Sequence, residues 1–136
     1  IRSPLWRHGG VVFGPHPRSY RQAMPKRMRR LALRCLLSSK VQEEKLVIVD
    51  SFGLSEPNTK EMARILSLLG VTGSALIATR EPEPAVVLSA RNLPRLRTQP
   101  AAYLNVVDLM HHDYLVMTQD AVRRAEELWG QAVVKV

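Results

Sequence analysis

The chain has 136 residues, of which 46% are hydrophobic, and it carries a formal net charge of +8. This length and composition predict one globular domain with a real core, and no uninterrupted apolar run of about 18 residues is present, which excludes a transmembrane helix. Cys35 is the single cysteine, which excludes an internal disulfide and is typical of a reducing compartment such as the cytoplasm.

The positive charge is concentrated at the start of the chain. Residues 1–42 contain ten Lys or Arg and no Asp or Glu, whereas residues 43–136 contain the other ten and all twelve acids. An excess confined to one segment indicates a polyanionic partner, either a nucleic acid or an anionic membrane surface. We favour the nucleic acid, because a membrane-surface helix would need the apolar face that this chain uses for its core.

Residues 1–23 show neither helical nor strand periodicity. Gly9-Gly10, Gly14-Pro15 and Pro17 interrupt them. We therefore predict an extended, irregular arm with a short strand at residues 11–13. On its own the arm should be disordered, because it has too little apolar surface to offset the entropy of ordering.

A helix is predicted to follow, from about Pro25 to Lys40, since proline suits a first helical turn. One face is expected to pack against the core, with Cys35 as a small core residue; it comprises Met28, Leu31, Ala32, Cys35 and Leu36. Leu33 and Leu37 widen the apolar surface, which indicates that the helix is covered on more than one side. The opposite side is basic and comprises Arg27, Arg30 and Arg34.

From residue 45 onward, strands and helices alternate. Short runs of β-forming residues predict strands, buried on both faces where the run is continuous, over 45–50, 74–80, 113–118 and, more weakly, 95–98. Helical spacing predicts helices over 59–69, 83–92, 106–111 and 118–129, the first capped by Asn58 and stopped by Gly70, the third capped by Asn105. Alternation with short connections predicts a three-layer α/β/α fold with a mostly parallel sheet.

The predicted organisation is thus an extended basic N-terminal arm at residues 1–23 and an α/β globular domain at residues 24–136. The first helix has no strand before it in this sequence. We therefore expect a strand upstream, which would make the chain a fragment of a longer one.

Enzymatic chemistry finds little support in the sequence. No glycine-rich nucleotide loop and no nucleophile elbow is present, and His111-His112 are adjacent, so on a helix they point about 100° apart. Asp50 follows a predicted strand, where a catalytic carboxylate would lie, and the alternative function is a small α/β enzyme or response-regulator-like domain acting through Asp50. Turn or capping hydrogen bonds explain Asp50 more simply, and we expect no catalytic residue, cofactor, metal or small-molecule substrate.

The arm has the composition of an RNA-binding segment. Arginine forks match phosphate oxygens, and Trp6, Phe13 and Tyr20 can stack on unpaired bases. Glycines permit close backbone approach, and prolines lower the entropy lost on ordering. The alternative interpretation, without an RNA-binding role, is a flexible linker followed by a basic helix that is exposed to solvent.

The first forty residues closely resemble the bacterial form of the universal large-subunit ribosomal protein four family. That family shows an R-[SA]-P-x-[WF]-x-x-G-G-x-x-x-F-G-P-x-P-R-x-[YW] stretch and then a basic helix. The matching residues are Arg2-Ser3-Pro4, Trp6, Gly9-Gly10, Phe13-Gly14-Pro15, Pro17-Arg18, Tyr20, Pro25-Lys26-Arg27 and Arg30-Leu31-Ala32-Leu33. The likeness continues more loosely over nearly the whole chain. His8 replaces a glycine that is frequent in the family, and His16 stands where lysine is common.

The resemblance implies a structural ribosomal protein of the cytoplasmic ribosome, which binds and stabilises large-subunit rRNA and supports subunit assembly. In the intact family protein a long extension penetrates the rRNA and helps line the peptide exit tunnel, and residues 1–20 look like its returning limb. Neighbouring large-subunit ribosomal proteins are implied partners, and some family members also act on an mRNA leader or on transcription in autoregulation. The residues expected to bind rRNA are Arg2, Trp6, Arg7, His8, Gly9, Gly10, Phe13, Gly14, Pro15, His16, Pro17, Arg18, Tyr20, Arg21, Lys26, Arg27, Arg30 and, more weakly, Lys60.

Overall fold

The computed structural model describes residues 1–130, and the last six residues of the predicted domain lie outside them. Its elements follow one another as α1 (Lys26–Gln42), β1 (Leu46–Val49), α2 (Thr59–Leu68), β2 (Ala75–Thr79), α3 (Pro84–Ala90), β3 (Leu96–Pro100), a 3₁₀ turn η1 (Ala101–Tyr103), α4 (Val106–His111), β4 (Tyr114–Thr118) and α5 (Gln119–Trp129). Every predicted helix and strand after residue 24 is present, with ends that differ from the prediction by at most two residues.

The strands form one parallel sheet in the order β1-β4-β2-β3. β4 is the last strand in the chain but lies in the middle of the sheet, where Leu115 is in register with Leu46 on one side and Leu76 on the other. The expected α/β fold with a mostly parallel sheet is confirmed, and within the described residues every strand pairing is parallel.

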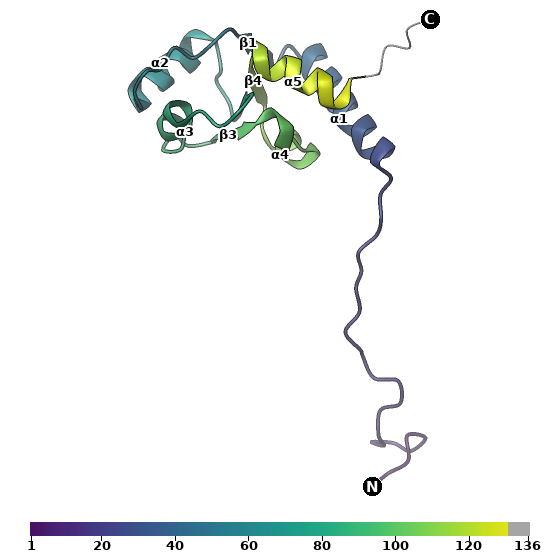
Figure 1. Ribbon diagram of the computed structural model, residues 1–136. Helices are drawn as coiled ribbons and strands as arrows, with labels where there is room; N and C mark the ends of the chain where they lie inside the picture. The colour runs from purple at the N-terminus through teal and green to yellow at the C-terminus, as the bar shows by residue number, and fades with distance from the viewer. Residues whose placement is uncertain (131–136) are drawn as a thin grey trace, which may run out of the picture.

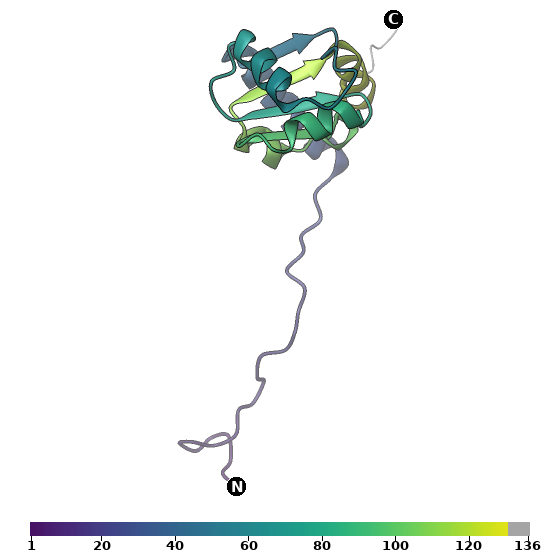
Figure 2. The ribbon, with the colours of Figure 1, turned by 90° about the vertical axis from the view of Figure 1, so that its left-hand side faces the viewer.

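Helices cover both faces of the sheet, as a three-layer fold requires (Figures 1 and 2). Alternate side chains of β2 and β4 point to opposite faces. Leu76 and Leu115 face α1, α4 and α5, whereas Ile77 and Val116 face α2 and α3. Burying both faces explains why these strands have continuous apolar sequences.

β1 departs from the prediction of a strand buried on both faces. Within residues 1–130 it lies at the edge of the sheet and pairs only with β4, and Ile48 is 54% exposed. An apolar run predicts a strand but does not by itself give its position in the sheet, so the sequence could not distinguish an edge strand from a central one.

α1 packs through a face that is only partly the one predicted. Ala32 and Leu36 are half-buried and Leu36 packs against the core, as expected. Leu33 and Lys40 are buried and Leu37 is half-buried, whereas Met28 and Leu31 are 56% and 54% exposed. Cys35 is exposed too, so its prediction as a core residue is wrong. Residues 31–37 are apolar on almost every side, so helical spacing could not select the stripe that meets the sheet. The sheet contacts the stripe that continues to the C-terminal end of the helix.

Lys40 fixes that end of α1 to the body. Its ammonium group donates hydrogen bonds to the carbonyl oxygens of His112 at 2.8 Å and Asp113 at 2.9 Å. The Asp113 carboxylate accepts hydrogen bonds from the hydroxyl and backbone N–H of Ser74, which hold the pKa of Asp113 below its usual value. A buried lysine is thus satisfied by the carbonyl groups where α4 leads into β4.

The predicted helix caps are present. The Asn58 side chain accepts hydrogen bonds from the backbone N–H groups of Lys60 and Glu61, and the Asn105 side chain accepts one from Asp108. Thr118 caps α5 in the same way through Ala121. Gly70 adopts a φ of +73° directly after α2, the left-handed conformation that commonly ends a helix. Among the described helices, none combines the length and apolar character required to cross a bilayer.

Candidate nucleic-acid interface

The arm, residues 1–23, projects away from the globular body and then coils near its start (Figures 1 and 2). It contains no helix or strand, so the short strand predicted at residues 11–13 is wrong. The β-forming residues Val11 and Val12 indicated a strand, but no other strand lies beside them with which they could pair. Nearly every residue of the arm is exposed, with only Gly9 and Gly14 half-buried.

The beginning of the arm folds into a small loop of its own. Backbone hydrogen bonds join Trp6 N–H to Ser3 C=O at 2.9 Å, Gly9 N–H to Trp6 C=O at 2.9 Å and Gly10 N–H to Arg2 C=O at 3.3 Å. A Cβ atom at Gly9 would lie only 1.9 Å from the Ser3 carbonyl oxygen. The first glycine of the pair is therefore required by the loop itself, a reason that differs from the predicted approach to RNA.

The second glycine and Gly14 are in a different position. A Cβ at Gly10 would meet nothing within 4 Å, and one at Gly14 would make only ordinary contact with Val11. The loop does not require glycine at either position. The expectation that they let a backbone approach RNA closely remains a prediction.

The aromatic residues of the arm are displayed to solvent. Trp6, Phe13 and Tyr20 are 69%, 96% and 76% exposed. The Arg18 guanidinium lies over the Tyr20 ring, with its carbon 4.3 Å from the ring centroid, an arrangement that joins a positive charge to a flat stacking surface. None of these rings packs in the body's core, so the faces of Trp6 and Phe13, and the face of Tyr20 away from Arg18, are available to bases.

The start of α1 continues the positive surface. Lys26, Arg27, Arg29 and Arg30 are all exposed. Helix α1 has no side-chain cap and no acidic residue in its first turn, whereas α2, α4 and α5 have both. The uncapped N–H groups and the helix dipole add to the positive charge of the side chains. Such a helix start is suited to bind anions.

The other predicted basic residues are distributed differently from the expectation. Arg30 is exposed, as Arg27 is, and it also lines a groove against α4. Arg34 is half-buried, and its Nε atom has no hydrogen-bond partner within residues 1–130. Lys60 is exposed at the start of α2, on the opposite face of the sheet from α1. The structure therefore does not bring Lys60 together with the arm and α1.

Arg29 is the basic residue that the sequence prediction omitted. It belongs to the same stripe as Leu33 and Leu36, at a spacing of four and seven residues, and it lines the groove beside Lys26 and Arg30. That spacing was visible in the sequence.

Features expected of an enzyme are sparse in the body. Asp50 follows β1 and is exposed, and residues 1–130 contain no group of three His, Cys, Asp or Glu that could hold a metal ion. His112 is buried, and its Nδ1 lies 2.8 Å from the Asp108 carbonyl oxygen, a local structural contact.

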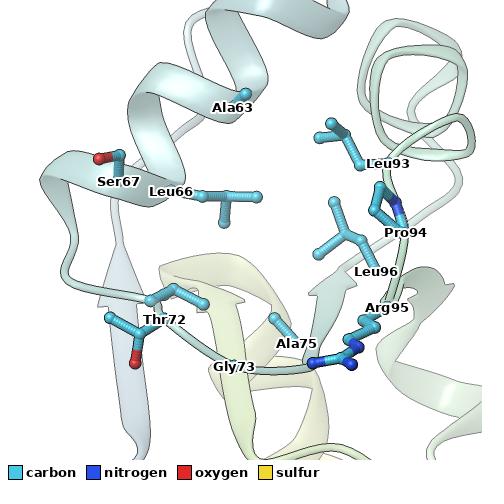
Figure 3. A pocket seen from close by; sticks show the side chains of 11 residues that line it. Ala63, Leu66, Ser67, Thr72, Gly73, Ala75, Leu93, Pro94, Arg95 and Leu96 are labelled. Atoms are coloured by element: carbon cyan, nitrogen blue, oxygen red, sulfur yellow. The ribbon is translucent and has the colours of Figure 1, made fainter.

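A hollow of about 310 Å³ lies between α2 and residues 93–96. Figure 3 shows Leu66, Leu93 and Leu96 pointing toward one another across it. It lies at the amino ends of β2 and β3, whereas ligands of open α/β sheets bind beyond the carboxyl ends of the strands. Its apolar lining explains it as an incompletely filled part of the core surface.

Comparisons of the sequence with a family model and with individual proteins identify the same family. The model of the ribosomal protein L4/L1 family matches residues 1–128. The chain is 49% identical over 130 residues to the large ribosomal subunit protein uL4 of Dehalococcoides mccartyi, covering 96% of this chain and 62% of that protein. It is 52% identical over 130 residues to uL4 of Pelotomaculum thermopropionicum, covering 96% and 63%.

The chain thus spans slightly less than two thirds of the length of these relatives. The match begins at residue 1 and so includes the arm as well as the body. Its relatives are named as ribosomal proteins, which agrees with the expectation that the chain is not an enzyme. The chain belongs to the ribosomal protein L4/L1 family.

Proposed function

We propose that this chain is a structural component of the large ribosomal subunit of the cytoplasmic ribosome, where it binds and stabilises large-subunit rRNA. The relatives are named as large ribosomal subunit proteins, and the arm has the chemistry that such a role needs. Neighbouring ribosomal proteins are further proposed partners, and in the intact protein the extension would support the exit-tunnel wall.

One observation carries this proposal: the arm and the first turns of α1 form one exposed basic surface that contains no acidic residue. Lys and Arg occur ten times in residues 1–42, without Asp or Glu. The arm buries almost nothing against the body, so contacts with a partner must offset the entropy lost when it is fixed. Neutralising closely spaced phosphates supplies that free energy and releases counterions.

The residues proposed to bind rRNA divide into three groups. The basic side chains would contact phosphates, the exposed aromatic and histidine rings would stack on bases or fill crevices, and the glycines and prolines would set the path of the backbone. Lys60 is the weakest member, because it lies across the sheet from the others.

The salt dependence of RNA binding tests the proposal. If about six phosphates are neutralised, the slope of log affinity against log salt should be roughly −4 to −5. Replacing Arg18, Lys26, Arg27 and Arg30 together by Ala should reduce the magnitude of that slope by about 3. Filter binding to a large-subunit rRNA fragment over a range of KCl concentrations measures both values.

A matched control separates a local interface from the effect of net charge. Four exposed arginines of the body, Arg64, Arg80, Arg91 and Arg123, are replaced by Ala, which lowers the net charge by the same amount. The control should keep a slope close to that of the unmodified chain. Equal slopes for the two quadruple variants would contradict the assignment of the interface to the arm and α1.

A further inference from the structure

A groove runs between the first turns of α1 and the segment that joins β3 to α4. In Figure 1 the start of α1 extends beyond the rest of the body, so the sheet does not cover this part of the helix. The groove has a volume of about 620 Å³, within the range of sites that hold several side chains or a small ligand. Its lining comprises Met24, Lys26, Arg29, Arg30, Ala32, Leu33, Ala102, Leu104, Asn105, Val106, Val107 and Trp129.

The floor of the groove is apolar. Leu33 and Leu104 are buried beneath it, and Val106 and Trp129 are half-buried along it. Asn105 is the one uncharged polar side chain in the lining, and both of its polar atoms are engaged: Oδ1 accepts from the Asp108 N–H, and Nδ2 donates to the Asp108 carboxylate, each at 2.7 Å. The side chains of the floor therefore suit an apolar group better than a nucleobase, whose edge needs hydrogen-bond partners.

The apolar surface continues from the groove along α4. Val107, which lines the groove, is 75% exposed, and Met110, one helical turn further, is 70% exposed. Residues three apart on a helix lie on the same side, so they extend the groove into a contiguous apolar strip. Such a patch, unlike an isolated apolar residue, marks an interaction surface.

The groove is also electrostatically one-sided. Lys26, Arg29 and Arg30 form the wall on α1, and no Asp or Glu belongs to the lining. These cations lie at the positive end of the α1 dipole. A partner that fits both features needs apolar side chains for the floor and carboxylates for the α1 wall.

We propose that this groove, together with the Val107 and Met110 face of α4, docks a protein segment in which apolar side chains are flanked by carboxylates. The apolar side chains lie against Leu33, Leu104 and Val107, and the carboxylates pair with the α1 cations. This surface does not include the arm, but it shares Lys26 and Arg30 with the proposed rRNA-binding residues. The inference is therefore tested by peptide binding in the absence of RNA.

Tryptophan fluorescence can test the proposal on the full chain. The sequence contains two tryptophans, so a Trp6→Phe background leaves Trp129, in the groove, as the single emitter. The probe is a synthetic amphipathic helical peptide with leucines at i, i+3 and i+4 and glutamates flanking them. We expect saturable binding with a change in Trp129 emission.

Two substitutions should weaken binding of this peptide. Val107→Asp places a carboxylate in the groove, and Arg29→Glu reverses one wall charge; the first should lower affinity by about tenfold, equivalent to the loss of one apolar contact. Met110→Asp provides a second apolar test if Val107→Asp disturbs folding, which circular dichroism will show. Leu88→Asp, on α3 across the sheet and 42% exposed, is the matched control and should have no effect.

The remaining outcomes would overturn the proposal. Equal binding of a peptide with lysine in place of glutamate would show that the cations of the α1 wall do not select for carboxylates. If the glutamate peptide does not bind at all, the groove is not a docking site. Displacement of the peptide by a single-stranded RNA oligonucleotide whose binding is also lost in Val107→Asp would assign the groove to nucleic acid. Val107-dependent self-association in light scattering would assign it to a second copy of the chain.

Discussion

The arm and the body place their apolar residues in opposite environments. In the body, Leu76, Ile77, Leu115 and Val116 are completely buried between the sheet and its helices. In the arm, Phe13 is 96% exposed and even Trp6 is 69% exposed. The body therefore has its own source of stability, whereas the arm has apolar and aromatic groups that only a partner can cover.

Charge follows the same division. The body pairs some of its ions, as in the contact between Arg97 and Asp108 at 2.7 Å, and beyond α1, in residues 43–136, twelve acidic residues face ten basic ones. The arm has no carboxylate to pair with, so its arginines retain their full attraction for an external polyanion. The difference teaches that substitutions in the core of the body should act on folding, and those in the arm and at the exposed basic start of α1 on binding.

The largest expected effect on folding is in the middle of the sheet. Leu76 on β2 is 0% exposed, and Leu76→Ala should lower the free energy of unfolding by about 2–5 kcal/mol, because it loses apolar burial and leaves a cavity. Urea unfolding followed by circular dichroism measures this. Leu68→Ala, at a site 78% exposed on α2, is the matched control and should change it by less than about 0.5 kcal/mol.

This substitution also tests the division itself. Under conditions where Leu76→Ala remains folded, its slope of RNA affinity against salt should equal that of the unmodified chain. A flatter slope would show that binding depends on the packing of the sheet, and the two regions would then not be independent.

A smaller loss is expected where α1 joins the body. Lys40→Met keeps most of the side-chain volume but leaves the His112 and Asp113 carbonyl oxygens without their donor. It should lower the free energy of unfolding by about 2 kcal/mol, the usual magnitude for hydrogen bonds to a charged group. Lys60→Met, at an exposed site on α2, should cost less than about 0.5 kcal/mol. Equal losses of unfolding free energy in the two variants would show that Lys40 does not anchor α1.

Local signals in the sequence were sufficient to predict most of the body. Asn58, Asn105 and Thr118 mark helix starts because a side-chain oxygen can accept from free N–H groups, and all three do so. Continuous apolar runs also predicted β2 and β4 from local sequence, because a strand buried on both faces has apolar residues at every position instead of alternating apolar and polar ones. These features depend on residues close in the chain.

Features that depend on distant parts of the chain could not be predicted. The position of β1 at the sheet edge follows from β4 inserting beside it, and the inward face of α1 follows from where the sheet meets the helix. Lys40 was not foreseen as buried, because its partners lie 72 and 73 residues away. In the arm, the resemblance indicated Gly9, but only the loop geometry gives its steric reason.

The smallest expected effect on folding is at Gly9, and it sharpens the comparison most. Gly9→Ala places a Cβ atom 1.9 Å from the Ser3 carbonyl oxygen, so the loop that includes the Gly10-to-Arg2 hydrogen bond must open. Because the loop contacts no part of the body's core, the free energy of unfolding should stay within about 0.5 kcal/mol of the unmodified value. RNA affinity should nevertheless fall, by about fivefold if opening the loop costs about 1 kcal/mol.

Gly10→Ala is the control for this prediction, because its added Cβ would meet nothing within 4 Å. Filter binding and urea unfolding are measured on both variants. Loss of RNA affinity in Gly9→Ala alone would show that the loop is formed before binding and presents the arm in a fixed shape. Loss in Gly10→Ala alone would instead mean that RNA approaches the backbone there and that the loop opens on binding, because a preformed loop cannot tolerate the Gly9 substitution without cost.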